Sequence, residues 1–318
     1  MLIHCSQERP LATQTPTSAP PATWKTLLAF AIIYFVWGST FLAIRVGVHE
    51  VPPLLLAAMR FSAAGLALVL WMLARGEHLP SRREWMSATL LAFFIFVMDY
   101  GALFWAEQRV PSGIAAVMLA TIPGFMALSE ILILRTQRLT ARLGLSLLIG
   151  LGGVAVLMSH SFNAGGAPID TKGAMALLCA SMSWSVASVG GRKLTLPASK
   201  VMSSGAQMLA GGVMLIFASA VFGEFKGFKP AAVSREAWLA LLYLIVFGSI
   251  IGFTAYVWLM HHQSPTKVGT YAYVNPVVAV IVGYFLGGEA LGLRTIAGTL
   301  CVLVSVMIVT TARKPSTS

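Results

Sequence analysis

Long apolar segments alternate with short polar ones along almost the whole chain. Each apolar segment has about 20 residues, the length that a helix needs to cross a hydrocarbon core about 30 Å thick. Helices are expected because a spanning segment must satisfy its own backbone N–H and C=O groups. The pattern therefore predicts an all-α membrane protein with ten transmembrane helices, near residues 26–46, 53–74, 85–106, 112–134, 140–158, 171–191, 200–222, 236–259, 266–288 and 292–311.

The composition agrees with a membrane protein. Apolar residues make up 57% of the chain and charged residues 10%, whereas charged residues make up about 25% of a typical soluble domain. The net charge is +11, but the basic residues occur singly or in short groups between the predicted spans. This distribution indicates membrane topology and not a nucleic-acid-binding surface. Residues 1–25 are rich in Pro, Thr, Ser and Ala, which predicts a disordered N-terminal tail.

The distribution of Lys and Arg predicts the orientation of the chain. Of the 22 basic residues, 14 fall on the side of the two termini and seven on the opposite side, while Arg60 falls within a span. Basic residues accumulate in cytoplasmic loops. We therefore expect a multi-pass protein of the bacterial inner membrane with both termini in the cytoplasm.

The chain contains an internal repeat. At an offset of 147 residues, Trp37 aligns with Trp184 and Arg45 with Arg192, and a longer loop then shifts the offset to 153. Further pairs that follow in order are Gly65 with Gly212, Glu77 with Glu224, Ser81 with Ser234, Trp85 with Trp238, Trp105 with Trp258 and Pro123 with Pro276. Apolar periodicity alone does not align such residues, so we predict two five-helix repeats, at 26–158 and 171–311. Because five is odd, the second repeat is expected to be inverted in the membrane.

Several segments resemble the drug/metabolite transporter superfamily, specifically proteins of the EamA-domain type and their YedA-like inner-membrane group. The segments that carry this resemblance are WGSTFLAIR (37–45), PPLLLAAMRF (52–61), PSGIAAVMLATIP (111–123), SWSVASVGGRK (183–193) and YAYVNPVVAVIVGYFLGGEAL (271–291). The resemblance covers about residues 26–312. It implies an inner-membrane carrier with a central cavity lined by helices 1, 3, 4, 6, 8 and 9. It also implies substrates such as amino acids, sugars or toxic compounds, which are often exported.

Two mid-helix prolines mark the candidate substrate site. Pro123 and Pro276 each lie about eleven residues into a predicted span, and each removes a backbone hydrogen bond, freeing the carbonyls of Leu119 and Ala272. Such carbonyls are tolerated at this depth where they face protein or water, so the pair predicts kinked helices beside a central cavity; a simple packing kink is the alternative. Other residues that could hold a zwitterionic or aromatic solute there are Trp37, Thr121, Ser181, Trp184, Ser185, Tyr256, Tyr271, Tyr273 and Asn275.

Three charged residues lie clearly inside the predicted spans, away from their ends: Arg60, Asp99 and Glu130. Arg60 and Asp99 are each seven residues from the same membrane face, which places both about 10 Å deep. An isolated charge is costly there, so we predict that they pair, either as an architectural contact or as a gate. Glu130 is close to the other face and is expected to extend toward Arg135 or Arg138.

Secondary transport is the function that these patterns favour, with a small-molecule solute and the lipid bilayer as partners. All six histidines lie in the tail, in loops or at span ends, and HExxH, GxSxG and P-loop motifs are absent from the sequence. An enzyme, a cofactor and a bound metal are therefore not predicted. A membrane channel and a non-transporting scaffold or receptor remain the alternatives, and nothing in the sequence indicates an oligomeric state.

Overall fold

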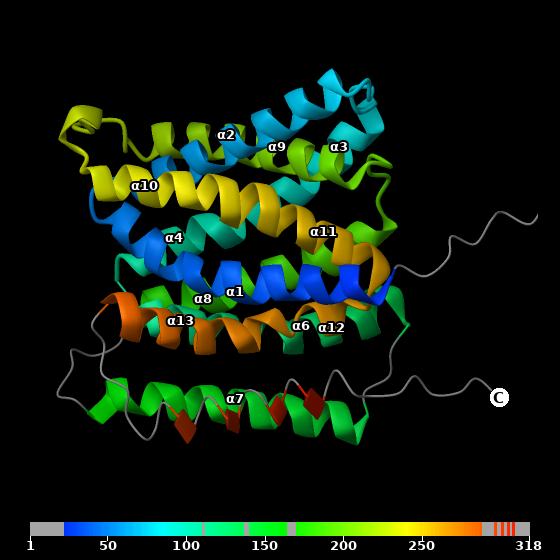
Figure 1. The fold of residues 1–318 in the computed structure, drawn as a ribbon, viewed down its shortest axis with the longest axis vertical. Helices are drawn as coiled ribbons and strands as arrows, with labels where there is room; N and C mark the ends of the chain where they lie inside the picture. Colours follow the sequence, from blue (N-terminus) through cyan, green and yellow to red (C-terminus); the bar gives the residue numbers. More distant parts are fainter. Residues whose placement is uncertain are drawn as a thin grey trace, which may run out of the picture.

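The computed structural model describes residues 22–109, 112–136, 140–163 and 170–287, together with isolated positions between 296 and 308. Within these residues the secondary structure is entirely helical (Figure 1). The first half contains α1 (Thr23–Val48), α2 (Pro53–Ala74), α3 (Arg82–Ala92), η1 (Phe93–Tyr100), α4 (Gly101–Glu107), α5 (Ser112–Leu119), α6 (Ile122–Ser129), η2 (Glu130–Leu134) and α7 (Ala141–Asn163). The second contains α8 (Thr171–Gly190), η3 (Gly191–Lys193), α9 (Lys200–Val221), η4 (Pro230–Ala232), α10 (Arg235–Tyr243), η5 (Leu244–Ile251), α11 (Gly252–His262), α12 (Pro265–Val268) and α13 (Tyr271–Gly287).

Seven helical stretches in the described part of the chain are long and apolar enough to cross a membrane. They are Thr23–Val48, Pro53–Ala74, Arg82–Glu107, Thr171–Lys193, Lys200–Val221, Arg235–His262 and Pro265–Leu286. Two shorter apolar helices, Ile122–Leu134 and Ala141–Gly153, fall within the predicted spans 112–134 and 140–158. The predicted tail (apart from its last residues) and most of the predicted span 292–311 lie outside the described residues.

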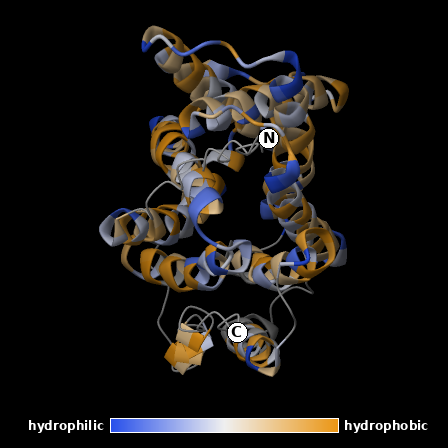
Figure 2. Cartoon of the chain, turned by 90° about the vertical axis from the view of Figure 1, so that its right-hand side faces the viewer, coloured by the Kyte–Doolittle hydropathy of each residue, from blue (hydrophilic) through white to orange (hydrophobic). Residues whose placement is uncertain are grey.

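The outer surface of the helices is apolar. Figure 2 shows the chain approximately along the helix axes, with hydrophobic colouring over much of the periphery. Large hydrophobic side chains are exposed there, including Phe35 (63%), Leu148 (68%) and Phe217 (67%). Exposed apolar patches of this extent mark contact with a partner or a membrane. Because they surround helices of spanning length, the surface fits a lipid bilayer.

A serine caps the N-terminus of two helices at corresponding places in the two halves, α3 and α10. Ser81 accepts a hydrogen bond from the Glu84 N–H at the start of α3, and Ser234 accepts one from the Ala237 N–H at the start of α10. Both helices then widen into π-helical turns, η1 and η5. π-Helical turns are rare and often occur at functional sites. The two serines are one of the aligned pairs in the sequence, so aligned positions begin similar local structures.

Glycines let α2 and α9 cross at close range. A Cβ on Gly65 would overlap the backbone of Leu209, and a Cβ on Gly212 would overlap the backbone nitrogen of Ser62. These two helices form the most extensive helix–helix contact in the described chain. Small residues allow such contacts in membranes, where packing takes over the role that the hydrophobic effect has in water.

The first helix of each half, α1 or α8, packs mainly against helices of the other half. α1 packs against α10, α11 and α13, while α8 packs against η1, α4, α5 and α6. Each of these two helices therefore lies mainly against helices from the other half of the chain. In Figure 1, α1 and α8 lie in the middle of the molecule and α7 lies along one edge, beside α13.

A methyl group at the α2–α9 crossing should destabilise the fold. We expect Gly212→Ala to lower the free energy of unfolding by about 1–3 kcal/mol, because the backbone of α2 must move away. Thermal unfolding of the detergent-purified protein measures the effect. Gly190→Ala is the matched control, because a Cβ there has open space around it and alanine favours a helix. Equal unfolding temperatures for the two variants would contradict this account of the crossing.

Candidate functional site

A small cavity lies where α1, η1, α5, α8 and α13 meet. Its water-accessible volume is about 40 Å³, which is room for a few water molecules. Four of the predicted site residues line it: Trp37, Trp184, Tyr271 and Asn275. The cavity is therefore central but too small, in this conformation, for a metabolite.

Four aromatic side chains form a cluster at this cavity, which we call the aromatic cluster: Trp37, Trp184, Tyr256 and Tyr271. The ring of Trp37 lies 5.7 Å from Trp184, 5.2 Å from Tyr256 and 4.9 Å from Tyr271, centroid to centroid. Its edge-on contacts with Trp184 and Tyr271 are the arrangement that aromatic pairs prefer. All four side chains are buried. The aromatic cluster draws on α1, α8, α11 and α13, so it joins both halves of the chain.

The helix that contains Pro123 is interrupted beside the cavity. α5 ends at Leu119 and α6 begins at Ile122. The hydroxyls of Ser181 and Ser185 donate within α8, to the carbonyls of Leu177 at 3.0 Å and Ser181 at 2.7 Å. They also contact the carbonyls of Met118 at 3.4 Å and Ile122 at 3.2 Å, on either side of the break. The serines of α8 thus lie beside the carbonyls on either side of the break, next to the Leu119 carbonyl that the proline is predicted to free.

Thr121 lies at the break itself. Its hydroxyl donates to the Met118 carbonyl at 2.7 Å. Pro123 is buried, and its Cα lies close to Gly269, so the broken helix crosses the segment between α12 and α13. Neither Thr121 nor Pro123 is among the residues that line the cavity. Their place is in the packing around it.

The second proline, Pro276, lies inside a helix, whereas Pro123 lies in the first turn of α6. α12 ends at Val268 and α13 begins at Tyr271, with Pro276 buried inside α13. Between the two helices, the hydroxyl of Thr270 contacts that of Tyr34 at 2.7 Å. With its amide nitrogen facing them, Asn275 donates to the carbonyls of Tyr271 and Tyr34 at 3.0 and 3.1 Å.

Tyr273, which the sequence places in the candidate site, does not line the cavity. Its ring lies against Gly150 of α7, in a separate small apolar cluster. Tyr271 and Asn275 are four residues apart and share one face of α13. Tyr273 lies between them, about 200° around the helix, and therefore points away.

The indole of Trp37 satisfies a carbonyl in the π-helical turn η5. Its Nε1–H donates to the Gly248 carbonyl at 2.9 Å, and Gly252 leaves room for the ring because a Cβ there would overlap it. Trp184, which aligns with Trp37 in the repeat, is equally buried, but its Nε1 has no hydrogen-bond partner in the described part of the chain. The two tryptophans thus occupy aligned positions of the repeat, but only the indole N–H of Trp37 forms a hydrogen bond among the described residues.

This difference predicts unequal effects of the same substitution. Trp37→Phe should cost about 1–3 kcal/mol of stability beyond the change in packing, because it leaves a buried carbonyl without its donor. Trp184→Phe is the matched control, since it removes an N–H that bonds no described group. Thermal unfolding in detergent should show a clearly larger decrease for Trp37→Phe. A larger loss for Trp184→Phe would mean that the bond to Gly248 has little energetic weight.

The predicted pair between Arg60 and Asp99 is wrong: no ion pair joins these two described residues. Arg60 is 1% exposed, its Nε donates to the Ser249 hydroxyl at 2.8 Å, and its guanidinium lies over the rings of Phe61 and Tyr100. Equal depth in the membrane did not determine the direction in which the side chains point. Asp99 instead lines the cavity.

Glu130 is also placed differently from the prediction. It is buried at 4% exposure and accepts hydrogen bonds from the hydroxyls of Thr266 at 2.9 Å and Thr136 at 3.1 Å. It forms no ion pair with Arg135 among the described residues, and Arg138 lies outside them. Glu130 therefore connects the end of α6 to α12, one helix from each half.

Other polar contacts join the halves at the opposite end of the helices. Glu224 accepts from the backbone N–H groups of Leu54 and Leu55 at 3.3 and 2.8 Å, and so caps α2. Glu50 accepts from the hydroxyl of Ser234 at 2.6 Å. Because each contact pairs a residue of one half with a residue of the other, separation of the halves at this end would require these bonds to break.

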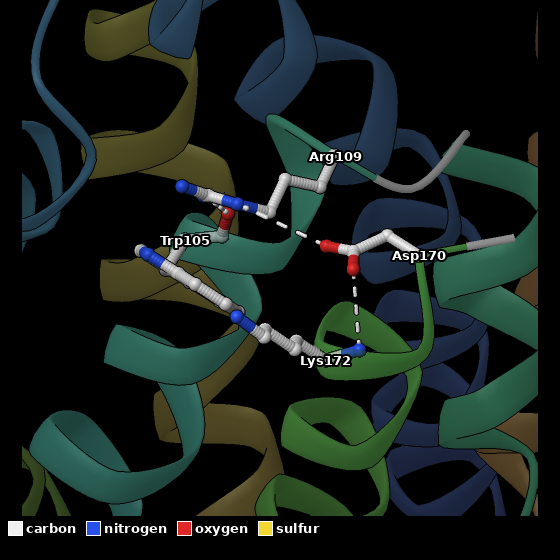
Figure 3. Close-up of polar contacts among 4 residues, drawn as sticks. All are labelled: Trp105, Arg109, Asp170 and Lys172. Carbon is white, nitrogen blue, oxygen red and sulfur yellow. Dashed lines mark hydrogen bonds and ion pairs between the residues drawn. The ribbon is translucent and has the colours of Figure 1, made fainter.

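An ion pair lies at the same end, between α4 and α8 (Figure 3). Arg109 Nε lies 3.9 Å from the carboxylate of Asp170, which also accepts from the Lys172 N–H at 3.2 Å as the N-cap of α8. The guanidinium lies 4.0 Å from the ring centroid of Trp105. Both charged side chains are partly exposed, so the pair contributes little stability by itself.

Sequence reasoning did not single out several cavity-lining residues, among them Thr40 and Tyr100, which carry hydroxyl groups. Thr40 lies one helical turn from Trp37 on the same face of α1, and Tyr100 follows Asp99, so their spacing from predicted residues was a usable signal. Among the described residues, no cluster of His, Cys, Asp and Glu is arranged to hold a metal ion.

The geometry defines a helical membrane protein with a central aromatic cavity between the two halves of its chain. The sequence pattern of the EamA-like transporter family matches residues 24–159 and 171–311. The chain belongs to this family, and it is therefore a multi-pass membrane transporter of the drug/metabolite kind.

Similar proteins agree with this assignment. The chain is 42% identical over 265 residues to the uncharacterized inner membrane transporter YedA of Escherichia coli K12, covering 83% of each protein. It is 24% identical to the uncharacterized transporter YvbV of Bacillus subtilis, covering 91% of this chain and 93% of that protein. A protein of known crystal structure has the same fold, with a TM-score of 0.72 at 22% identity over 91% of this chain and 97% of the other. The relatives are transporters, and YedA places the chain with inner-membrane proteins.

Proposed function

We propose that this protein is a secondary transporter that exports small metabolites, amino-acid-like solutes or related compounds, across the inner membrane by alternating access. The observation that carries the proposal is the aromatic cavity, which is lined by helices of both halves and contains polar atoms. Cavities between repeats near the centre of the membrane are where secondary transporters bind their solutes. The direction, export, rests on the family resemblance.

We further propose that the architecture is ten helices in an inverted five-plus-five repeat. Three observations support it. The family pattern matches the chain twice, at 24–159 and 171–311. The aligned glycines Gly65 and Gly212 lie at the same crossing, each against the other's helix. The aligned helices α1 and α8 each pack against the other half, as a pseudo-two-fold axis requires.

Transport through this cavity requires a conformational change. The volume of about 40 Å³ is far below that of ordinary ligand pockets. Polar contacts between the halves hold both ends: Glu224 and Glu50 at one, and Glu130 with Thr266 at the other. We propose that these contacts break and re-form alternately, so that the cavity opens to one side at a time.

Counterflow in proteoliposomes tests the transport proposal. Vesicles preloaded with a panel of unlabelled amino acids, amines and sugars should take up labelled solute of the same kind faster than empty vesicles, and uptake should saturate. We expect Trp37→Ala to reduce the rate at least tenfold, because Trp37 contacts three other rings of the aromatic cluster. Trp71→Ala is the control, since that side chain is 53% exposed on the outer face of α2.

Two results would contradict the proposal that the protein is a carrier, and neither resembles slow transport by a carrier. A channel would give a flux that rises linearly with solute concentration, with electrical conductance and without stimulation by preloading. Absence of flux for every solute in the panel, in vesicles that contain folded protein, would favour a scaffold or receptor.

Both termini are proposed to be cytoplasmic, as the excess of Lys and Arg on their side indicates. A green fluorescent protein fused to the C-terminus should fluoresce, because it folds in the cytoplasm. Alkaline phosphatase at the same position should be inactive, because its disulfides form only in an oxidising compartment. An active phosphatase fusion together with a non-fluorescent green fluorescent protein fusion would show that the predicted orientation is wrong.

A further inference from the structure

A buried carboxyl group without a partner forms part of the cavity wall. Asp99 lies in η1, is 3% exposed and lines the cavity. Its Oδ1 has no hydrogen-bond partner, and the side chain forms no ion pair, within the described residues. A carboxylate in such surroundings is costly unless a positive charge or a hydrogen-bond donor reaches it. The group is therefore available to a ligand in the cavity.

Aromatic rings surround the same space. Trp37, Tyr100, Trp184 and Tyr271 line the cavity together with Asp99. The faces of such rings attract cations, most strongly for tryptophan and where water is excluded. A carboxylate among aromatic faces is the combination that recognises an organic cation, because the acid balances the charge and the rings hold the apolar body.

The cavity wall contains no positive charge among the described residues, and Asp99 is its only charged member there. Arg60, on the neighbouring α2, is not among the residues that line the cavity; its guanidinium lies over the rings of Phe61 and Tyr100, with Nη1 unpartnered among the described residues. A zwitterionic solute would need a cationic partner for its carboxylate as well. A metal ion would need several ligands, and no such cluster exists in the described chain.

The comparison of the two halves supports a role for Asp99 in binding. In the second half, the aligned position is Gly252, which makes room for Trp37 while the indole donates to Gly248. In the first half, Asp99 takes the place of the glycine, and the indole N–H of Trp184 has no partner in the described structure. In the second half the indole N–H of Trp37 is thus satisfied by a carbonyl. In the first half the Asp99 carboxyl remains as an unpartnered acceptor and the Trp184 N–H as an unpartnered donor among the described residues.

We propose that the cavity binds a monovalent organic cation, an amine with an aromatic or apolar body, whose charge is balanced by Asp99. The proposal rests on the proposed transport function and names the class of its solute. On binding, the ammonium donates to the Asp99 carboxylate and the aromatic cluster encloses the rest of the molecule.

Equilibrium binding of radiolabelled 2-phenylethylamine to the full-length protein in detergent, at mildly alkaline pH, tests this proposal. We expect saturable binding that is displaced by unlabelled 2-phenylethylamine at least tenfold more effectively than by 2-phenylethanol, its neutral analogue, or by phenylalanine, its zwitterionic analogue. Asp99→Asn should weaken binding at least tenfold, and Asp99→Glu should retain part of the affinity. The unfolding temperature of each variant shows whether it is folded.

Glu107→Gln is the matched control. Glu107 is a second buried carboxyl on the same helical stretch, 6% exposed, with both oxygens unpartnered among the described residues, but it does not line the cavity. Its substitution should leave amine binding unchanged. If Glu107→Gln weakens binding as much as Asp99→Asn, the effect is not local to the cavity and the proposal is wrong.

The other outcomes separate this proposal from the proposed function. Unchanged affinity in folded Asp99→Asn, tighter binding of phenylalanine or 2-phenylethanol than of the amine, or no amine binding by the folded wild type would each overturn it. If the wild type in proteoliposomes still shows saturable counterflow of an amino acid or a sugar, transport stands and only the solute class is wrong. If it shows no counterflow of any solute, the transport function itself fails.

Discussion

The need to satisfy every backbone polar group away from water determines most of this structure. In a bilayer, a continuous helix meets this need by itself, so each interruption must be compensated by another part of the protein. At the break between α5 and α6, the Thr121 hydroxyl donates to the Met118 carbonyl, and the hydroxyls of Ser181 and Ser185 on α8 lie 3.4 and 3.2 Å from the carbonyls of Met118 and Ile122 while also bonding carbonyls of α8 itself. The π-helical turn η5 is compensated by the indole of Trp37 on α1. In both places a helix from one half brings a donor to carbonyls of the other half.

These compensating contacts also define where the cavity can be. A donor that satisfies a broken helix must lie close to it, and the elements involved therefore converge on one region between the halves. The same region contains the aromatic cluster and Asp99. Part of the interior polar chemistry, Asp99 included, therefore lies where the regular helices are interrupted, while Arg60 and Glu107 are buried polar residues of regular helices.

Much of the fold could be predicted from hydrophobicity, because the length of an apolar segment is linked directly to the thickness of the bilayer. The seven long helices match predicted spans to within a few residues, and the family resemblance is confirmed.

The depth of a residue could be predicted in the same way, but not the direction of its side chain. Arg60 and Asp99 were expected to pair because their depths are equal, yet they point to different surroundings. Tyr273 was grouped with Tyr271 and Asn275 by proximity in sequence, although helical periodicity places it on the other face. The position of Tyr273 could therefore have been predicted from periodicity, whereas the directions of Arg60 and Asp99 depend on the rotation of each helix about its axis, which packing against neighbours sets and a single sequence does not record.

The contact between α2 and α9 has a consequence for the origin of the protein. Under the proposed duplication, Gly65 and Gly212 descend from one ancestral residue, and each lies against the partner helix at the same crossing. A surface that meets its own copy in this way is the hallmark of a two-fold symmetric dimer. The ancestral five-helix unit would then already have associated with itself in opposite orientations before the two copies were fused. Fusion released the halves from having to be identical, and a position such as that of Asp99 and Gly252 could become an acid in one half and a glycine in the other.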